Sequence, residues 1–314
     1  MLIAGAVCPH PPLLIPAALG SAASDPPAEL RTVAGAAARA VAGLAAARPE
    51  AIVVVGGGAA ERDYGADAAG GLHAFGIGVT IGAGEPVLPL SLTVGRWLLE
   101  QGGILDREGA AAGGAAVVFQ EVARSAAAGD CIKLGRVLAD RAPRVALLAM
   151  GDACARPARE APGVPDPDAQ DYDYEIAEAL AAADARWLTR LDPARDEELV
   201  VAGRAAWQVL AGAAGGRRMH GRLLCMSAPY GVTYLVASWD QAPALSRGAQ
   251  GGGRHWLRSG HAVREGTRHG ERLRDPARSR RLRRAHRRSR RPAVRPAGGY
   301  RGGRRAPRGA GRGC

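Results

Sequence analysis

The stretch that decides the fold is residues 2–12, LIAGAVCPHPP. Its first part, Leu2–Val7, is a short and continuous apolar run, which is typical of a buried strand. The segment that follows, Cys8–Pro12, contains three prolines, so we expect a rigid loop there. Because a residue before proline is pushed into an extended conformation, His10 is held in this loop between two prolines.

The next segment predicts a helix and a second strand. Asp25-Pro26 predicts an N-cap with proline in the first helical turn, and apolar residues recur at helical spacing up to Pro49. Ile52–Val55 is a β-branched run without alternation, which is typical of a strand covered on both faces. Residues 1–55 therefore predict a strand, a loop, a helix and a strand.

Strands and helices continue to alternate up to Trp239. We expect strands over 75–81, 115–122, 145–150, 223–227 and 232–239, helices over 90–101, 130–141, 172–183 and 197–212, and a proline-rich loop over 157–167. The last two strands predict an antiparallel hairpin at one edge of the sheet. The pattern predicts an α/β fold for residues 1–240, a single layered domain with a central, mostly parallel sheet flanked by helices.

Charge divides the chain into two parts. Residues 1–240 hold 20 basic and 27 acidic residues, whereas residues 241–314 hold 22 arginines and three acidic residues. In the second part, the large aliphatic residues are only Leu245, Leu257, Val263, Leu273, Leu282 and Val294. A segment with so few apolar residues and so much charge cannot bury a core, so we expect a disordered tail.

Two interpretations of this tail remain open. Its arginine pairs and the segment Tyr300–Arg305, YRGGRR, are typical of nonspecific nucleic-acid binding through phosphate neutralisation. The chain also has a single lysine, Lys133, and no asparagine, which indicates a GC-rich gene. A mixture of Arg, Gly, Ala and Pro is what such DNA encodes out of frame, so the tail is either a nucleic-acid-binding segment or an out-of-frame extension.

Other features exclude several classes of protein. No apolar run reaches the roughly 18 residues that a membrane-spanning helix needs. The apolar start of the chain has no basic residue before it and is broken by prolines, which disfavours a secretory signal. The five cysteines form no Cys-x-x-Cys pair, which favours reduced thiols over a disulfide or zinc framework. We therefore expect a cytoplasmic protein with no membrane partner.

The candidate site residues are expected at one edge of the sheet, because each follows a predicted parallel strand and ligands bind where such strands end. They are His10, Asp152 and the crevice-lining glycines Gly56, Gly57 and Gly58. An imidazole on a rigid loop at this edge suits a metal ligand or a general base. The alternative is a histidine that hydrogen-bonds a neighbouring loop.

Two weaker alternatives concern neighbouring residues. The glycine run follows a strand, as a phosphate-binding loop does, but it lacks the G-x-G-x-x-G spacing, and Glu61 and Asp63 add charge of the wrong sign. Cys8 and Cys154 lie close to His10 and Asp152 in sequence, which suggests a thiol nucleophile. Free cysteines are more often small buried apolar residues.

Together these elements resemble the class III extradiol ring-cleavage dioxygenases. The shared features are a strand followed by Cys8-Pro9-His10-Pro11-Pro12, a Met150-Gly151-Asp152 loop after a later strand, and an Ala228-Pro229-Tyr230-Gly231 hairpin. The chain is similar to the protocatechuate 4,5-dioxygenase β subunit, and more closely to a divergent actinobacterial branch, over roughly residues 1–240. The resemblance implies Fe(II) held by two histidines and one carboxylate, and cleavage of a small catechol-type aromatic substrate with O₂.

The chain departs from this family at three of four functional positions. The resemblance places His10 as the first iron ligand. The second ligand would follow the second strand, where Gly56–Gly58 stand, and the acid/base histidine would lie within Ala153–Arg156. The carboxylate ligand would lie within Gly203–Trp207, which contains no acidic residue.

Few other residues could complete an iron site. The remaining histidines of residues 1–240 are His73 and His220, and Asp152 is the better placed carboxylate. One hypothesis is therefore a dioxygenase with a degraded metal site formed by His10 and Asp152. The other is a noncatalytic or repurposed member that binds a small molecule or a partner without iron. A homo-oligomer is compatible with both.

The tail gives the first testable prediction. We expect the full chain to bind duplex DNA without sequence preference and more weakly as salt rises, because arginines neutralise phosphates. A chain that ends at Asp240 should lose this binding, as measured by fluorescence anisotropy. Unchanged DNA binding by the shortened chain would show that residues 241–314 are not responsible.

Overall fold

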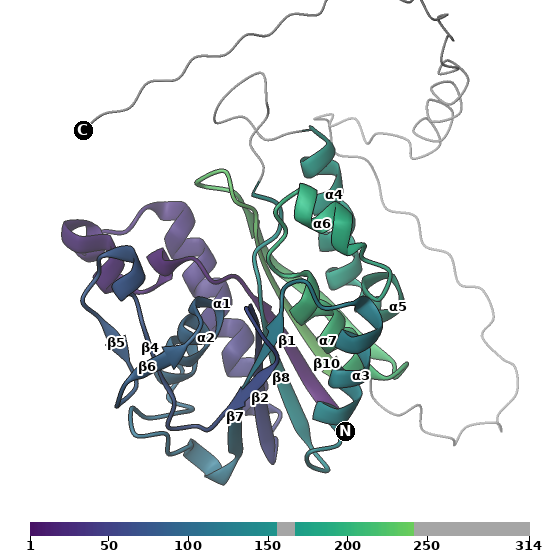
Figure 1. Ribbon diagram of the computed structural model, residues 1–314, viewed down its shortest axis with the longest axis horizontal. Helices are drawn as coiled ribbons and strands as arrows, with labels where there is room; N and C mark the ends of the chain where they lie inside the picture. Colours follow the sequence, from purple (N-terminus) through teal and green to yellow (C-terminus); the bar gives the residue numbers. More distant parts are fainter. Residues whose placement is uncertain (156–166, 242–314) are drawn as a thin grey trace, which may run out of the picture. The chain divides into compact units, whose positions relative to one another are not determined.

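The protein's computed structural model describes residues 1–155 and 167–241. Its centre is a seven-stranded sheet with the order β3-β7-β2-β8-β1-β10-β9 (Figure 1). The strands are β1 (Leu2–Cys8), β2 (Ala51–Gly58), β3 (Arg62–Tyr64), β7 (Ala116–Ala123), β8 (Val145–Met150), β9 (Met219–Ser227) and β10 (Tyr234–Gln241). Strands β1, β8, β2 and β7 are parallel, whereas β3, β10 and β9 pair antiparallel to their neighbours.

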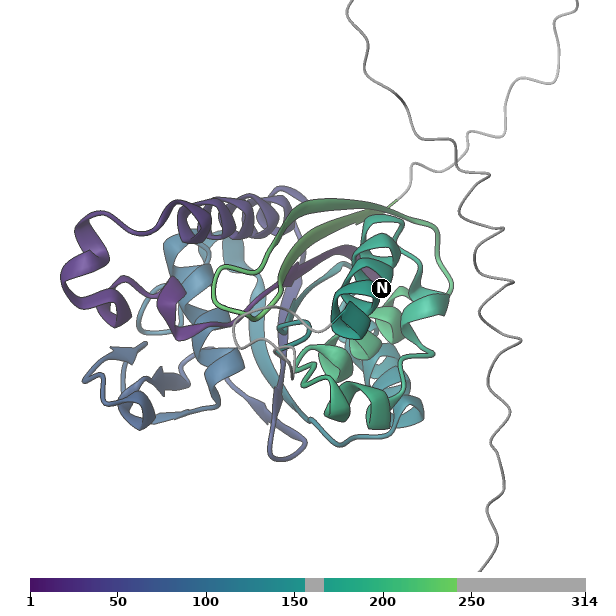
Figure 2. The same ribbon diagram turned by 90° about the horizontal axis from the view of Figure 1, so that it is seen from above.

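Helices cover both faces of this sheet, as Figures 1 and 2 show. One face carries α1 (Ala28–Ala46), α2 (Leu90–Gln101) and a small sheet of β4 (Ala69–Gly71), β5 (Thr80–Ile81) and β6 (Pro86–Leu88). The other carries α3 (Ala128–Ala139), α4 (Pro167–Ala181), α5 (Ala185–Leu188), α6 (Pro193–Glu198) and α7 (Arg204–Ala214). Short 3₁₀ helices are η1 (Pro12–Leu14), η2 (Pro16–Ser24), η3 (His73–Phe75) and η4 (Ala112–Gly114).

Two hydrophobic cores lie on the two faces of the sheet. Ile52 and Val54 of β2 pack into the core with α1 and α2, whereas Val53 and Val55 pack into the core with α3, α4 and α7. Burial on both faces is why the central strands are apolar at every position. The structure thus confirms the predicted α/β fold with a mostly parallel sheet flanked by helices and a closing hairpin, β9–β10, at one edge.

Most predicted elements have nearly the bounds that periodicity gave, and three differ. Asp25 does not cap a helix: α1 begins at Ala28, and Asp25 instead pairs with Arg31 at 2.8 Å. The predicted strand 75–81 is mostly irregular: Phe75 ends η3, Gly76 adopts a left-handed φ of 74°, and only Thr80–Ile81 form a strand, β5. The predicted helix 197–212 is interrupted between α6 and α7 over residues 199–203.

All described residues fall within one compact unit, Met1–Arg247. The predictions of a disordered tail over 241–314 and of a loop over 157–167 lie almost wholly outside the described residues. Within the described part of the chain, no helix combines the length and the apolar composition needed to cross a bilayer.

Helices α3 and α7 cross at Gly135 of α3 and Gly212 of α7. This contact can be tested. A Cβ on Gly135 would lie 2.0 Å from the Val209 carbonyl oxygen, whereas a Cβ on Gly129 of the same helix would meet nothing within 4 Å. We expect Gly135→Ala to destabilise the protein by about 1–3 kcal/mol through overpacking. Gly129→Ala should leave its thermal midpoint unchanged or slightly raised, because alanine favours helix. Equal midpoints for the two variants would contradict the close α3–α7 packing.

Candidate functional site

The structure brings His10 and Asp152 together at the carboxyl edge of the sheet. Cys8 and Met150 are neighbours across the β1–β8 pairing, so the residues that follow each strand leave the sheet side by side. Asp152 Oδ1 accepts a hydrogen bond of 2.8 Å from the His10 backbone N–H and lies 3.7 Å from His10 Nδ1. The carboxylate therefore fixes the loop that carries the imidazole.

The imidazole of His10 is almost fully enclosed. The residue is 5% exposed, and its Nδ1 has no hydrogen-bond partner among the described residues. Burial lowers the pKa of His10; the Asp152 carboxylate opposes this shift and the Arg124 guanidinium adds to it. The imidazole is therefore neutral at neutral pH.

The glycine run forms the end of β2 and is filled by neighbouring side chains. A Cβ on Gly56 would lie 2.4 Å from Ser91 Oγ, and one on Gly58 would lie 2.0 Å from a Glu121 carboxylate oxygen. A Cβ on Gly57 would lie 3.2 Å from Arg124 Cγ. These glycines permit close packing over the strand end.

The backbone N–H groups beyond the glycines already hold an anion from the protein itself. Glu121 Oε1 accepts hydrogen bonds from the N–H groups of Ala59 at 2.6 Å and Ala60 at 3.1 Å, and Oε2 accepts one from the Tyr64 hydroxyl at 2.7 Å. Burial alone would raise the pKa of Glu121, but these donors outweigh it and lower the pKa. The carboxylate therefore occupies the place that a phosphate would take in a glycine-rich loop.

Neither of the two cysteines near the site has a thiol with a lowered pKa. Burial raises the pKa of Cys8 to about 12. Burial and the hydrogen-bonded Asp173 carboxylate also raise the pKa of Cys154. Both thiols are therefore protonated at neutral pH, which argues against the thiol nucleophile considered from the sequence.

The donor groups do not fit a ferrous ion. Within the described residues, no three side chains of His, Cys, Asp or Glu are grouped as metal ligands. His73 and His220 are exposed and lie on η3 and β9, away from His10. In the late helix, the segment expected to hold a carboxylate, Gly203–Trp207, has none, and the guanidinium of its Arg204 donates to main-chain carbonyls. The His10–Asp152 pair supplies one histidine and one carboxylate, so among the described residues the site lacks the second histidine of the two-histidine, one-carboxylate set that holds Fe(II).

A cavity of about 550 Å³ lies at this edge, where β7 ends beside α6 and the start of α7. Its lining includes Arg124, Ser125, Pro193, Asp196, Val201 and Arg204. Arg124 is exposed and forms no ion pair with any described residue. Its charge also acts on His10, so the cavity and the imidazole share one electrostatic environment.

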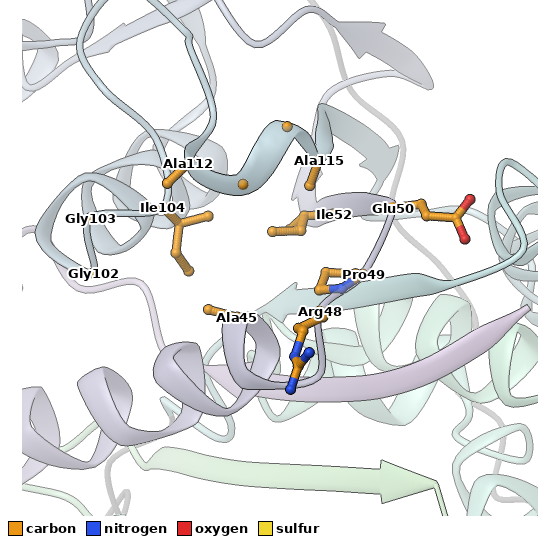
Figure 3. Close-up of a pocket in the computed structure, with 12 residues that line it drawn as sticks. Ala45, Arg48, Pro49, Glu50, Ile52, Gly102, Gly103, Ile104, Ala112 and Ala115 are labelled. Atoms are coloured by element: carbon orange, nitrogen blue, oxygen red, sulfur yellow. The ribbon is translucent and has the colours of Figure 1, made fainter.

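A second cavity of about 520 Å³ lies at the opposite edge, where β2 begins. Figure 3 shows that its centre is bounded by Ile52, Ile104 and small residues, and that the charged ends of Arg48 and Glu50 point away from it. Ligand sites usually combine apolar walls with converging polar groups. The cavity beside Arg124 meets this criterion better.

No pattern in the sequence marks Arg124 or Asp196 as a site residue. Arg124 follows a predicted strand, but a single arginine in an arginine-rich chain does not stand out. Asp196 is one of several acids in the segment DPARDEE, and its burial depends on packing against α4 and α7. Arg204 lies in the segment where the family resemblance places a carboxylate ligand, and its hydrogen bonds reach carbonyl groups about 80 positions away in the sequence.

Comparison with known proteins adds no functional assignment. No protein-family model matches the chain, and no curated protein matches it. Among solved structures, the chain is similar to the uncharacterised protein JW3007 from Escherichia coli K12, with 16% sequence identity and a TM-score of 0.44. The match covers 76% of this chain and 99% of that one.

The His10 environment predicts a defined titration. The folded protein keeps His10 neutral, whereas the unfolded chain takes up a proton near pH 6.5, so this residue's contribution to stability is lost as the pH falls through that value. Asp152→Asn should lower the His10 pKa further, and Arg124→Gln should raise it. Imidazole NMR with His10→Gln as the assignment control measures both shifts. Shifts in the opposite directions would contradict the proposed contacts.

Proposed function

We propose that the protein binds a small molecule with an acidic group and an apolar body at the carboxyl edge of its sheet, without using iron. The observation that carries this proposal is the Arg124 guanidinium, which lines a cavity of about 550 Å³ and has no ion-pair partner among the described residues. A guanidinium binds carboxylates and phenolates through paired charge-assisted hydrogen bonds.

The other walls of the cavity support a ligand with an apolar body. Pro193, Val201 and Ala202 line it, and its volume lies within the range of about 300–1,000 Å³ that is usual for small-molecule sites. Arg204 also lines the cavity, and its guanidinium is held by hydrogen bonds to the carbonyl oxygens of Ala126 and Arg124 and by an ion pair with Asp196 at 3.8 Å. Its charge is therefore already balanced, which leaves Arg124 as the cation for the acidic group.

The family resemblance left two hypotheses, a dioxygenase with a degraded metal site and a noncatalytic or repurposed member. We propose the second. In the dioxygenases that it resembles, a ferrous ion would balance the negative charge of a catecholate. Here Arg124 supplies positive charge near His10, while the second histidine and the carboxylate ligand are missing. We place this activity in the cytoplasm, which the free thiols of Cys8, Cys131, Cys154 and Cys225 support.

Titration with benzoate tests this proposal. We expect benzoate to bind the full chain equally well in EDTA and after anaerobic loading with Fe(II), because no bound metal takes part. Arg124→Gln should weaken binding about 10- to 100-fold, because a hydrogen bond to a charged group contributes about 1.5–3 kcal/mol. Arg136→Gln, at an exposed position on α3, is the matched control and should leave the calorimetric Kd unchanged.

Oxygen uptake, measured with an oxygen electrode, tests the alternative of ring cleavage. Catechol-dependent oxygen uptake that needs Fe(II) and disappears in His10→Ala would overturn the proposal in favour of ring cleavage. Failure of benzoate to bind, or equal binding by Arg124→Gln, would also contradict it.

A further inference from the structure

The cavity beside Arg124 also has a free negative charge in its wall. Glu197 of α6 lines the cavity and is exposed to solvent. Its carboxylate forms no hydrogen bond or ion pair with any residue of the described ranges, 1–155 and 167–241. Arg124 is free in the same sense, so two opposite charges share one cavity without pairing with each other. Each of them is available to a charged group of a ligand.

The other two charged residues of the lining neutralise each other. Arg204 Nε lies 3.8 Å from Asp196 Oδ2, and both side chains are almost fully buried. This pair therefore belongs to the fold, and Arg124 and Glu197 are the charges that remain for a ligand. The Glu197 carboxylate would repel an anion at Arg124, whereas a ligand with one positive and one negative group would be attracted by both side chains.

Hydrogen-bonded backbone segments carry the two free charges. Arg124 directly follows β7, where its N–H donates to the Gly58 carbonyl oxygen at 3.2 Å. Glu197 lies in the last turn of α6, where its carbonyl oxygen accepts the Val200 N–H at 3.3 Å. The wall that holds both charges is therefore formed before a ligand binds, which lowers the entropic cost of binding.

We propose that the ligand of this cavity is a zwitterion, with an acidic group at Arg124 and a protonated amine at Glu197. The acidic half rests on the proposed function, whereas the amine rests on Glu197 and on the charge balance of the lining. Pro193, Val200 and Val201 supply apolar contacts to the body of the ligand. The ligand class is therefore a small amino acid with an apolar body.

Calorimetric titration of the full chain with matched probes tests the amine. We expect 4-(aminomethyl)benzoate to bind about 5-fold more tightly than benzoate, which corresponds to about 1 kcal/mol, the upper value for an exposed ion pair. Because both side chains are exposed, this preference should shrink in about 1 M KCl. Equal Kd values for the two probes, or a preference that KCl leaves undiminished, would overturn the inference.

Glu197→Gln gives opposite changes for the two probes. It should weaken the binding of 4-(aminomethyl)benzoate, which loses the partner of its amine, and strengthen the binding of benzoate, which is no longer repelled. Damage to the fold would weaken both. Glu178→Gln alters an exposed acid on α4 outside the cavity lining, and it should leave both Kd values unchanged. Changes of the same sign for the two probes in Glu197→Gln would contradict the inference.

The two proposals fail separately. Benzylamine should bind more tightly than benzyl alcohol, which has a similar shape without the charge, and this margin should depend on Glu197 and not on Arg124. That result would support the amine site even if benzoate failed to bind. Benzoate binding without any preference for the amine would overturn the inference and leave the function proposed above.

Discussion

The parallel pairing of β1, β8 and β2 is the constraint on which the rest of the structure depends. Its register places Cys8, Met150 and Gly56 side by side, so three strands from distant parts of the sequence end together. The His10 loop, the Asp152 loop and the glycine run therefore leave the sheet at one edge. Burial of these strands on both faces leaves that edge as the place where their polar groups gather.

Three carboxylates near this edge have different environments. Asp152 accepts the His10 backbone N–H, and Glu121 accepts two backbone N–H groups and the Tyr64 hydroxyl. Both therefore hold the protein's own loops in place. Asp196, the most deeply buried of the three, lies 3.8 Å from Arg204 Nε and faces the Tyr172 hydroxyl. All three carboxylates are therefore engaged with groups of the protein itself.

The sequence predicted the elements that depend on local patterns and missed those that depend on distant contacts. The helix Leu90–Gln101 and the strand Val145–Met150 have the predicted bounds, because their apolar periodicity is set by the cores that they enter. The small sheet was missed, since its strands have only two or three residues. A left-handed Gly76 also ended the strand that was expected there.

The positions of the candidate site residues could be predicted from local patterns, but their contacts could not. His10 and Asp152 follow strands that apolar runs reveal, so their meeting at one edge could be anticipated. That Asp152 would hold a backbone N–H, and that Glu121 would fill the space beyond the glycines, depends on residues about 60 to 140 positions apart. The segment between α6 and α7 was predicted as continuous helix, because nothing in its composition marks the left-handed φ of 56° at Val200.

That segment is also fixed to the sheet. A Cβ on Gly151 would lie 2.1 Å from the Gly203 Cα, and the Gly203 N–H donates to the Asp152 carbonyl oxygen at 2.9 Å. Two backbones in such close contact move together, so the cavity wall formed by residues 200–202 is held at its carboxyl end by β8. A side chain at Gly151 would therefore push this wall away from the sheet.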